Sequence, residues 1–443
     1  MGNKSKKKSV AVPTGRLARL GNITAMTASV SGSMLLDGVS QLSHGRRPVI
    51  RDLLLTPRNI SRVTEQLSKM RGAAMKIGQL VSMDTGDYLP RELAQIISRL
   101  RDDAHAMPPA QLKKVLNAQL PKGWLASFKN FDVQPIAAAS IGQVHRAQLK
   151  DGRDLAMKVQ YPGIAASIDS DVANVGVLIK LSGLLPKGFK MDTYLDEGRK
   201  QLHEETDYAR EASNLIHFRK LLKDAPQFVV PVAHLDWSTP NILTMDYVLG
   251  AAIESLGQDS QGVRDQVVEN LISLALRELL DFRLMQTDPN FANYLYQRDT
   301  QKIVLLDFGA VRAINPIISR GYKRLISAGL NNNICSLADA ASDIGFFDAN
   351  TSSEHRDRIT QMIHLIFDVI HKNSIVDFKY LNLHQQLQAD GLALLEDGFI
   401  PPKLPIDVLL IQRKFAGIFL LATRLEARVN LGKILRAQGE LLL

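Results

Sequence analysis

The stretch QTDPNFANYLYQRDTQKIVLLDFG, at residues 286–309, places two acidic residues and an amide in a defined order. Asp288 precedes Asn293 by five positions, and Asp307 opens the tripeptide Asp-Phe-Gly. An apolar run at 303–306 comes immediately before Asp307 and is typical of a short buried strand. We therefore expect Asp307 at the exposed end of that strand.

The order of these three residues suits phosphoryl transfer. Protein kinases carry H-R-D-x-x-x-x-N in their catalytic loop and D-F-G after it, and Asp288 and Asn293 keep that spacing. Magnesium prefers oxygen ligands, which Asn293 and Asp307 offer as an amide and a carboxylate. Asp288 would then orient or deprotonate the attacking group. The alternative is a loop of solvated Asp and Asn side chains, the usual interpretation of an isolated Asp-Phe-Gly.

The composition is that of an ordinary soluble globular chain. Its 443 residues suffice for two or three packed lobes, and 45% are hydrophobic and 22% charged. The single cysteine, Cys335, excludes an intramolecular disulfide and favours a reducing compartment. The longest apolar stretches are interrupted by Lys180 and by Arg413 and Lys414. We therefore expect a cytoplasmic protein with no transmembrane helix.

The basic N-terminal segment accounts for part of the net charge of +9. Its cations are Lys4, Lys6, Lys7, Lys8, Arg16 and Arg19. These cations would either form a solvated tail or contact anionic lipid headgroups. In the second case each cation near the membrane contributes about 1 kcal/mol to membrane binding. Nucleic acid is disfavoured, because no aromatic interleaving or recognition motif accompanies the charge. Residues 17–42, rich in small side chains, suit either core packing or a shallow interfacial helix.

A β-rich segment at 131–158 carries a second pattern related to phosphate binding. Asp151-Gly152 predicts a hairpin between strands at 144–149 and 155–159. Ahead of it, Ala137-x-Ala139-x-x-Gly142-x-Val144 matches the kinase phosphate loop with its first two glycines replaced by alanine. Lys158 stands where the V-A-I-K lysine stands, so we expect it to pair with phosphate. The residues of this loop predicted to bind nucleotide are Ala137, Ala138, Ala139, Ser140, Ile141, Gly142 and Val144.

Lys158 also needs a carboxylate partner. The charged segment 195–218 predicts one helix, on which Glu204, Asp207, Tyr208 and Glu211 share a face. A solvated acidic face is the alternative. We further expect helices at 61–80, 90–100, 110–120 and 263–282, strands at 229–231 and 243–248, a hinge at 245–248, and several amphipathic helices from 316 to 443.

Four motifs in this order resemble those of the UbiB family of atypical protein kinase-like proteins, also called AarF or ADCK proteins. KIGQ at 76–79 is similar to the family's KxGQ motif, AAAS at 137–140 to its alanine-rich loop, and ETD at 205–207 to its ExD motif. TDPNFAN at 287–293 with LLDFG at 305–309 is similar to its catalytic and metal-binding pair. The resemblance extends from about residue 56 to at least residue 312.

The resemblance implies an α+β, bilobal protein kinase-like fold with an N-terminal helical extension over the active site. The expected domains are a basic, small-residue-rich segment at 1–55, the helical extension with KxGQ at 56–125, a kinase-like N-lobe at 126–248 and a helical C-lobe at 249–443. A helix laid over the cleft would block a polypeptide substrate. The alanines restrict the loop backbone. Both features favour ATP hydrolysis or a small lipid-like substrate.

The resemblance also implies roles for individual residues. Lys76, Gly78 and Gln79 would enter the nucleotide pocket as regulatory residues, with Glu205 and Asp207 as partners of Lys76. For the partner of Lys158, Glu211 is the first choice and Glu205 the second. The remaining implied roles are nucleotide binding for Met245 and Val248, catalysis for Asp288 with Lys158, and Mg²⁺ binding for Asn293 and Asp307.

By resemblance, the chain is an atypical kinase-like ATPase that binds ATP with Mg²⁺ and supports ubiquinone biosynthesis. The ending ILRAQGELLL lacks the membrane helices of some bacterial members and so resembles the soluble subgroup. The implied partners are an isoprenoid-quinone or phenolic lipid intermediate, quinone-biosynthesis proteins and, peripherally, an anionic membrane. Two alternatives remain: a small-molecule phosphotransferase, which would not need KIGQ or ETD, and a nucleotide-switched lipid-binding scaffold without turnover.

Overall fold

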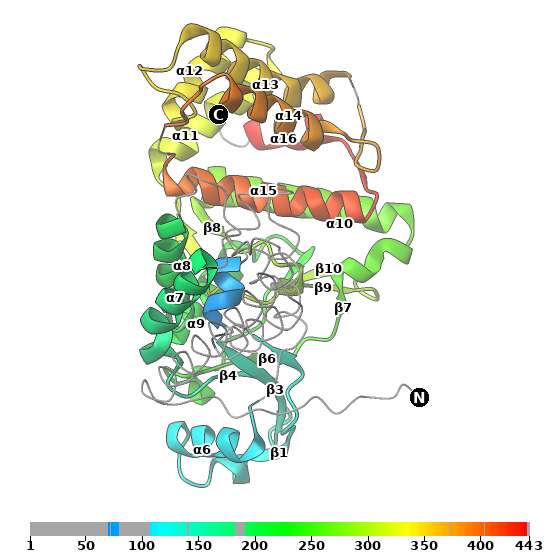
Figure 1. The fold of residues 1–443 in the computed structure, drawn as a ribbon. Helices are drawn as coiled ribbons and strands as arrows, with labels where there is room; N and C mark the ends of the chain where they lie inside the picture. The colour runs from blue at the N-terminus through cyan, green and yellow to red at the C-terminus, as the bar shows by residue number, and fades with distance from the viewer. Residues whose placement is uncertain are drawn as a thin grey trace, which may run out of the picture. The chain divides into compact units, whose positions relative to one another are not determined.

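The computed structural model describes residues 70, 72–78, 107–139, 141–181, 191–372, 374–402 and 404–440 (Figure 1). Contacts within the chain divide it into two units. The first contains the described residues up to Ser213 together with Val232–Tyr247, and the second contains Asn214–Pro231 and the residues from Val248 onward. The backbone therefore passes from one unit to the other three times.

The first unit is built on an antiparallel sheet in the order β1-β3-β4-β6, with β2 paired to β3. Its strands are β1 (Phe128–Phe131), β2 (Ala137–Ala138), β3 (Gly142–Leu149), β4 (Asp154–Gln160) and β6 (Ile242–Asp246). The predicted hairpin at Asp151-Gly152 is confirmed, because β3 and β4 pair in register on either side of it. Alternate residues of β4, namely Leu155, Met157 and Val159, are fully buried and belong to the core of this unit.

The longer helices of this unit are α6 (Pro109–Gln119), α7 (Ile164–Leu181), α8 (Met191–Glu205) and the first part of α9 (Tyr208–Leu221), and a short helix lies at 72–78. The prediction of one helix at 195–218 is wrong, because the chain breaks between α8 and α9 at Thr206 and Asp207. The Asp207 carboxylate accepts a hydrogen bond from the Arg210 amide at 2.9 Å and so caps a new helix. Helix α7 was not predicted from the sequence.

The second unit is mostly helical. Helix α10 (Gln261–Arg277) continues into a π-helical turn, Glu278–Phe282. A four-stranded sheet has the order β5-β10-β9-β7, and β8 pairs with β11. These strands are β5 (Phe228–Val229), β7 (Ala251–Ala252), β8 (Leu284–Gln286), β9 (Tyr294–Gln297), β10 (Lys302–Leu305) and β11 (Val311–Ala313). The strand predicted before Asp307 is confirmed as β10.

The remaining elements are α11 (Pro316–Leu330), α12 (Ile334–Ile344), α13 (Ser353–Lys372), β12 (Val376–Asp377), α14 (Leu383–Glu396), α15 (Ile406–Arg424), β13 (Arg428–Val429) and α16 (Leu431–Glu440). The several helices predicted from 316 onward are thus confirmed. Helices α10 and α15 lie side by side (Figure 1). Because of this contact, α15 also lies near the residues that follow α10 in the chain.

Some predictions fall on residues that the structure does not describe. Of the helix predicted at 61–80, residues 70 and 72–78 are described, and 72–78 is helical. The segment 1–55, the helix at 90–100, Gln79 and Ser140 lie outside the described residues. Among the described helices, none combines the length and apolar character that crossing a membrane requires. The domain boundaries drawn from the sequence stay predictions.

Candidate active site

A buried ion pair joins β4 to α9 in the first unit. Lys158 Nζ donates to both carboxylate oxygens of Glu211, at 2.9 and 3.0 Å. Only 9% of Lys158 and 2% of Glu211 is exposed. Glu211 stands in the first turn of α9, where the helix dipole stabilises a carboxylate. The structure thus pairs Lys158 with Glu211, and Glu205 has a different partner.

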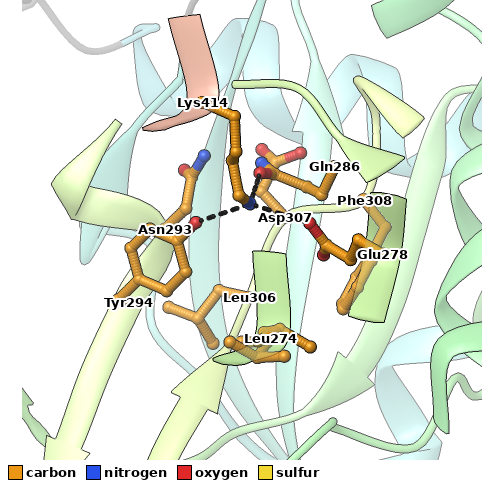
Figure 2. Close-up of a pocket in the computed structure, with 10 residues that line it drawn as sticks. Leu274, Glu278, Gln286, Asn293, Tyr294, Leu306, Asp307, Phe308 and Lys414 are labelled. Carbon is orange, nitrogen blue, oxygen red and sulfur yellow. Dashed lines mark hydrogen bonds and ion pairs between the residues drawn. The ribbon is translucent and has the colours of Figure 1, made fainter. Parts of the chain in front are cut away.

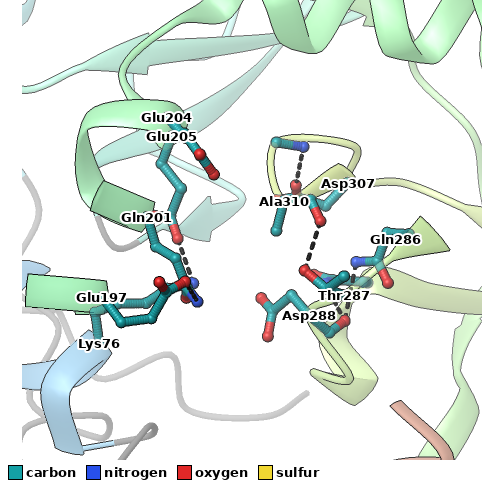
Figure 3. Close-up of polar contacts among 12 residues, drawn as sticks. Lys76, Glu197, Gln201, Glu204, Glu205, Gln286, Thr287, Asp288, Asp307 and Ala310 are labelled. Atoms are coloured by element: carbon teal, nitrogen blue, oxygen red, sulfur yellow. Dashed lines mark hydrogen bonds and ion pairs between the residues drawn. The ribbon is translucent and has the colours of Figure 1, made fainter. Parts of the chain in front are cut away.

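That partner is Lys76, from the short helix 72–78. Lys76 Nζ lies 2.5 Å from the Glu205 carboxylate at the end of α8 (Figure 3). Lys76 is 2% exposed, and Gly78 in the same helix is also buried. Asp207 is not a second partner of Lys76, because its exposed carboxylate caps α9 instead. The ETD segment therefore performs two separate tasks, an ion pair and a helix cap.

The alanine-rich loop forms the β2-β3 hairpin. Ala137 lies opposite Val144, Ala138 opposite Gln143, and the Ala139 amide donates to the Gly142 carbonyl at 2.8 Å. A Cβ on Gly142 would overlap the Val159 carbonyl oxygen and press on the Tyr208 hydroxyl. The loop therefore needs a glycine at position 142, because β3 lies too close to β4 and α9 for a side chain there.

A chain of buried hydrogen bonds begins next to this loop. Gln143 accepts from the Met107 amide at 2.8 Å and lies 2.8 Å from His145 Nε2. His145 Nδ1 lies 2.8 Å from the Asp132 carbonyl, which can only accept, so Nδ1 carries the proton and Nε2 accepts from Gln143. Burial lowers the pKa of His145, although the Asp132 carbonyl partly opposes the shift. His145 is therefore a neutral structural residue.

The predicted hinge residues lie where the chain changes units. Met245 belongs to β6 and pairs with Ala156 of β4. The Tyr247 amide donates to the Asp154 carbonyl at 2.8 Å, and Val248 is the first residue of the next segment of the second unit. Contact of Met245 and Val248 with nucleotide stays a prediction.

The predicted catalytic loop lies in the second unit between β8 and β9. The Thr287 amide and hydroxyl both donate to the Ala310 carbonyl, at 2.9 and 2.8 Å. The Leu306 amide donates to the Asn293 carbonyl at 3.0 Å. Figure 3 shows Asp288 and Asp307 on the two segments that these bonds connect. The structure therefore brings the catalytic loop and the Asp-Phe-Gly segment together.

The donor set at this loop suits magnesium bound with a nucleotide. Asn293 Nδ2 lies 3.4 Å from the Asp288 carbonyl, which assigns the amide oxygen of Asn293 the acceptor role. Asp307 Oδ1 accepts from the Gly309 amide at 2.9 Å. No cluster of three or more His, Cys, Asp or Glu side chains that could hold a metal occurs in the described part of the chain. Magnesium characteristically uses one or two protein carboxylates and completes its shell with phosphates and water, so Asn293 and Asp307 fit this ion.

A buried polar cluster lies next to these residues and was not predicted. Lys414 Nζ lies 3.0 Å from Gln286 Oε1, 3.1 Å from the Tyr294 hydroxyl and 3.3 Å from Glu278 Oε2 (Figure 2). Together with Asn293 and other residues, they line a cavity of about 10 Å³, room for one water molecule. Burial raises the pKa of the Glu278 carboxyl, and the Lys414 ammonium partly offsets that shift.

The sequence did contain a signal for this cluster. Arg413 and Lys414 stand side by side in the middle of a mostly apolar helix, and both are buried. Two adjacent cations in a buried helix require polar partners elsewhere in the fold. The sequence argument used them only to exclude a membrane span.

Residues 99–341 match the family model described as the ABC1 atypical kinase-like domain, which covers more than half of the chain. The chain belongs to this family. The mitochondrial atypical kinase COQ8 of Saccharomyces cerevisiae is 37% identical over 431 residues, covering 97% of this chain and 86% of the yeast protein. Atypical kinase COQ8B of Danio rerio, also mitochondrial, is 34% identical over 95% of this chain and 68% of its own length.

The solved structure of Rv3197 from Mycobacterium tuberculosis, a complex with erythromycin, has a similar fold. Its TM-score is 0.60 at 24% identity, covering 85% of this chain and 93% of that one. The expected α+β kinase-like fold and the resemblance to the UbiB family are thus confirmed, and the chain is a COQ8-like atypical kinase. Membership of a kinase-like family implies ATP binding. The family match includes Lys158, Glu211 and Asp307, whereas Lys76 and Lys414 lie outside it.

Proposed function

We propose that this ABC1-family chain is an ATPase that binds ATP with Mg²⁺ and supports ubiquinone biosynthesis. The observation that carries the proposal is the buried Lys158–Glu211 ion pair. In protein kinases the corresponding Lys–Glu pair must be formed for the lysine to hold the nucleotide phosphates. A lysine already fixed by two hydrogen bonds loses little side-chain entropy when phosphate binds.

The roles of the other residues follow from the chemistry of phosphoryl transfer. Asn293 and Asp307 would hold Mg²⁺, which neutralises charge on the phosphates. Asp288 would orient the attacking group, with water as the acceptor in hydrolysis. The residues 137–142 and 144, with Met245 and Val248, would line the nucleotide. Lys76, Gly78 and Gln79 would regulate access to it, with Lys76 held by Glu205.

The metabolic role rests on the relatives. The yeast and zebrafish relatives are named as mitochondrial atypical kinases, and the yeast protein aligns with nearly the whole chain. We assign this chain an isoprenoid-quinone or phenolic lipid intermediate as the coupled ligand, with quinone-biosynthesis proteins as partners. The basic cluster between Lys4 and Arg19 would provide the peripheral contact with an anionic membrane.

The test is steady-state ATP hydrolysis by the purified protein with Mg²⁺, with and without anionic liposomes and a phenolic mimic of a quinone precursor. Hydrolysis should rise with the additives and disappear in Asp307→Asn. Nucleotide binding without turnover under any condition would instead favour the scaffold. Transfer of phosphate to a small molecule, with little hydrolysis, would favour the small-molecule phosphotransferase.

A further inference from the structure

We propose that α15 holds the catalytic loop in place and that Arg413 is a positioning residue for the Asp288 carboxylate. The inference rests on the proposed function, because it concerns the same loop. Helix α15 (Ile406–Arg424) follows the part of the chain that matches the family model, which ends at residue 341. Three of its residues contact the loop or the strands on either side of it.

Lys414 fixes the two ends of the loop. Gln286 precedes the loop as the last residue of β8, and Tyr294 follows it as the first residue of β9. Lys414 Nζ donates to both, and its third partner is Glu278 in the π-helical turn. Two of these contacts are hydrogen bonds, and the contact with Glu278 is an ion pair at 3.3 Å. Because Lys414 is 2% exposed, losing one of these partners would leave its charge poorly compensated.

Gly417 brings the helix close to the loop itself. A Cβ at this position would overlap the Pro289 side chain. Pro289 follows Asp288 directly, so the contact fixes the backbone that carries the predicted catalytic carboxylate. Residues four apart share one face of a helix, and Arg413 therefore stands one turn before Gly417 on this face.

Arg413 contacts the carboxylate. Its Nη2 atom lies 3.5 Å from Asp288 Oδ1, and the two side chains are 8% and 17% exposed. A distance of 3.5 Å is longer than the 2.7–2.9 Å typical of a charge-assisted hydrogen bond. The contact is therefore a Coulombic attraction that orients the carboxylate and leaves it able to accept a hydrogen bond from the attacking group. Low exposure limits screening of this attraction by salt.

The variants that test the proposal are Arg413→Gln, which removes the charge, and Arg413→Lys, which keeps it. The matched control is Arg424→Gln on the same helix, whose exposed side chain pairs with Glu254. In Arg413→Gln, kcat for ATP hydrolysis should fall about 10- to 100-fold while KM for ATP changes less than about twofold. Arg413→Lys should recover most of kcat, and Arg424→Gln should behave as the wild type.

Wild-type kcat in Arg413→Gln would overturn the proposal. Equal losses of kcat in Arg413→Lys and Arg413→Gln would also overturn the proposal, because they would show that Arg413 acts through packing and not through its charge. If Arg413→Gln does not fold, Arg413→Lys and Gly417→Ala keep the test open. Arg413→Lys should still retain most of kcat, whereas Gly417→Ala should lower kcat by displacing Pro289. Wild-type kcat in Gly417→Ala would contradict the role of α15.

A second measurement separates this inference from the proposed function. The urea midpoints of Arg413→Gln, Asp288→Asn and the double variant form a cycle that does not depend on turnover. A shift in the double variant smaller than the sum of the single shifts would show that Arg413 acts on Asp288. Additive shifts would overturn the proposal even if ATP is hydrolysed. Wild-type protein without turnover would overturn the proposed function, and the cycle would still decide whether Arg413 holds Asp288.

Discussion

Lys158 and Glu211 are 53 residues apart in the sequence, yet they form one of the least exposed ion pairs of the first unit. Both side chains are almost inaccessible to water, so each charge depends on its contacts within the protein, and this ion pair is one of them. The pair therefore contributes to the fold and, by our proposal, to nucleotide binding.

Removing one member should destabilise the protein more than removing both. We expect Glu211→Gln or Lys158→Met to lower the free energy of unfolding by about 3–5 kcal/mol, since each leaves a buried charge without its partner. The double variant Lys158→Met/Glu211→Leu should recover part of that loss without recovering ATP binding. Urea denaturation and nucleotide titration measure the two effects. Arg298→Met, which removes the more exposed pair with Asp259, is the control and should cost about 1 kcal/mol or less.

Gly142→Ala should be destabilising for a steric reason. The added Cβ would meet the Val159 carbonyl oxygen, a backbone atom that cannot rotate away. We expect a loss of about 1–3 kcal/mol, typical of overpacking. Gly262→Ala is the matched control. It lies in α10 with nothing within 4 Å of an added Cβ, so it should be neutral or stabilise by up to about 1 kcal/mol. Equal thermal shifts in the two variants would contradict this explanation.

His145 should make stability depend on acid pH. Its pKa in the folded protein is lowered by burial from the ordinary value of 6.5, so the unfolded chain binds the proton first. The contribution of neutral His145 to the free energy of unfolding is fully present above about pH 6.5. It is lost as the pH falls through the folded-state pKa. The difference in unfolding free energy between the wild type and His145→Gln should shrink over that range. A difference that stays constant with pH would contradict the prediction.

Lys414→Met should destabilise the protein in a pH-dependent way. At neutral pH it leaves Glu278 buried without a cation, which should cost about 3–5 kcal/mol. Burial raises the pKa of the Glu278 carboxyl in the folded protein above its value in the unfolded chain. The contribution of protonated Glu278 to the free energy of unfolding is therefore complete below the unfolded-state pKa. It declines as the pH rises through the folded-state pKa. The variant should therefore approach wild-type stability in acid. Denaturant midpoints from pH 4 to pH 8 measure this. Lys379→Met, which removes the exposed pair with Glu426, should show little change.

Structural elements that are specified by neighbouring residues could be predicted from the sequence. The turn at Asp151-Gly152 and the apolar run before Asp307 each lie within a few residues of the element that they specify. The helix break at Asp207 was missed, because an aspartate inside a charged segment looks the same whether it caps a helix or lies on its surface. The motif order identified the family, and by that resemblance Glu211 was the first choice as the partner of Lys158 and Glu205 the second.

The contacts that α15 makes with distant segments could not be predicted. Lys414 and Gln286 are 128 residues apart, and Arg413 and Asp288 are 125 apart. No periodicity within α15 indicates which loop its cations approach. Glu278 in the π-helical turn is likewise paired with Lys414, which lies far along the chain. Two adjacent cations in an apolar helix were the one local indication that such contacts exist.

The contacts made by α15 also affect how this protein can be divided. A fragment that ends at residue 341 would contain Lys158, Asp288 and Asp307, and every position of the family match. It would nevertheless leave Gln286, Tyr294 and Glu278 without the ammonium of Lys414, which contacts all three. By our proposal, a fragment with every motif would therefore lack part of what holds the predicted catalytic loop in place. Any chimera or shortened form designed to transfer its activity must carry the helix from Ile406 to Arg424.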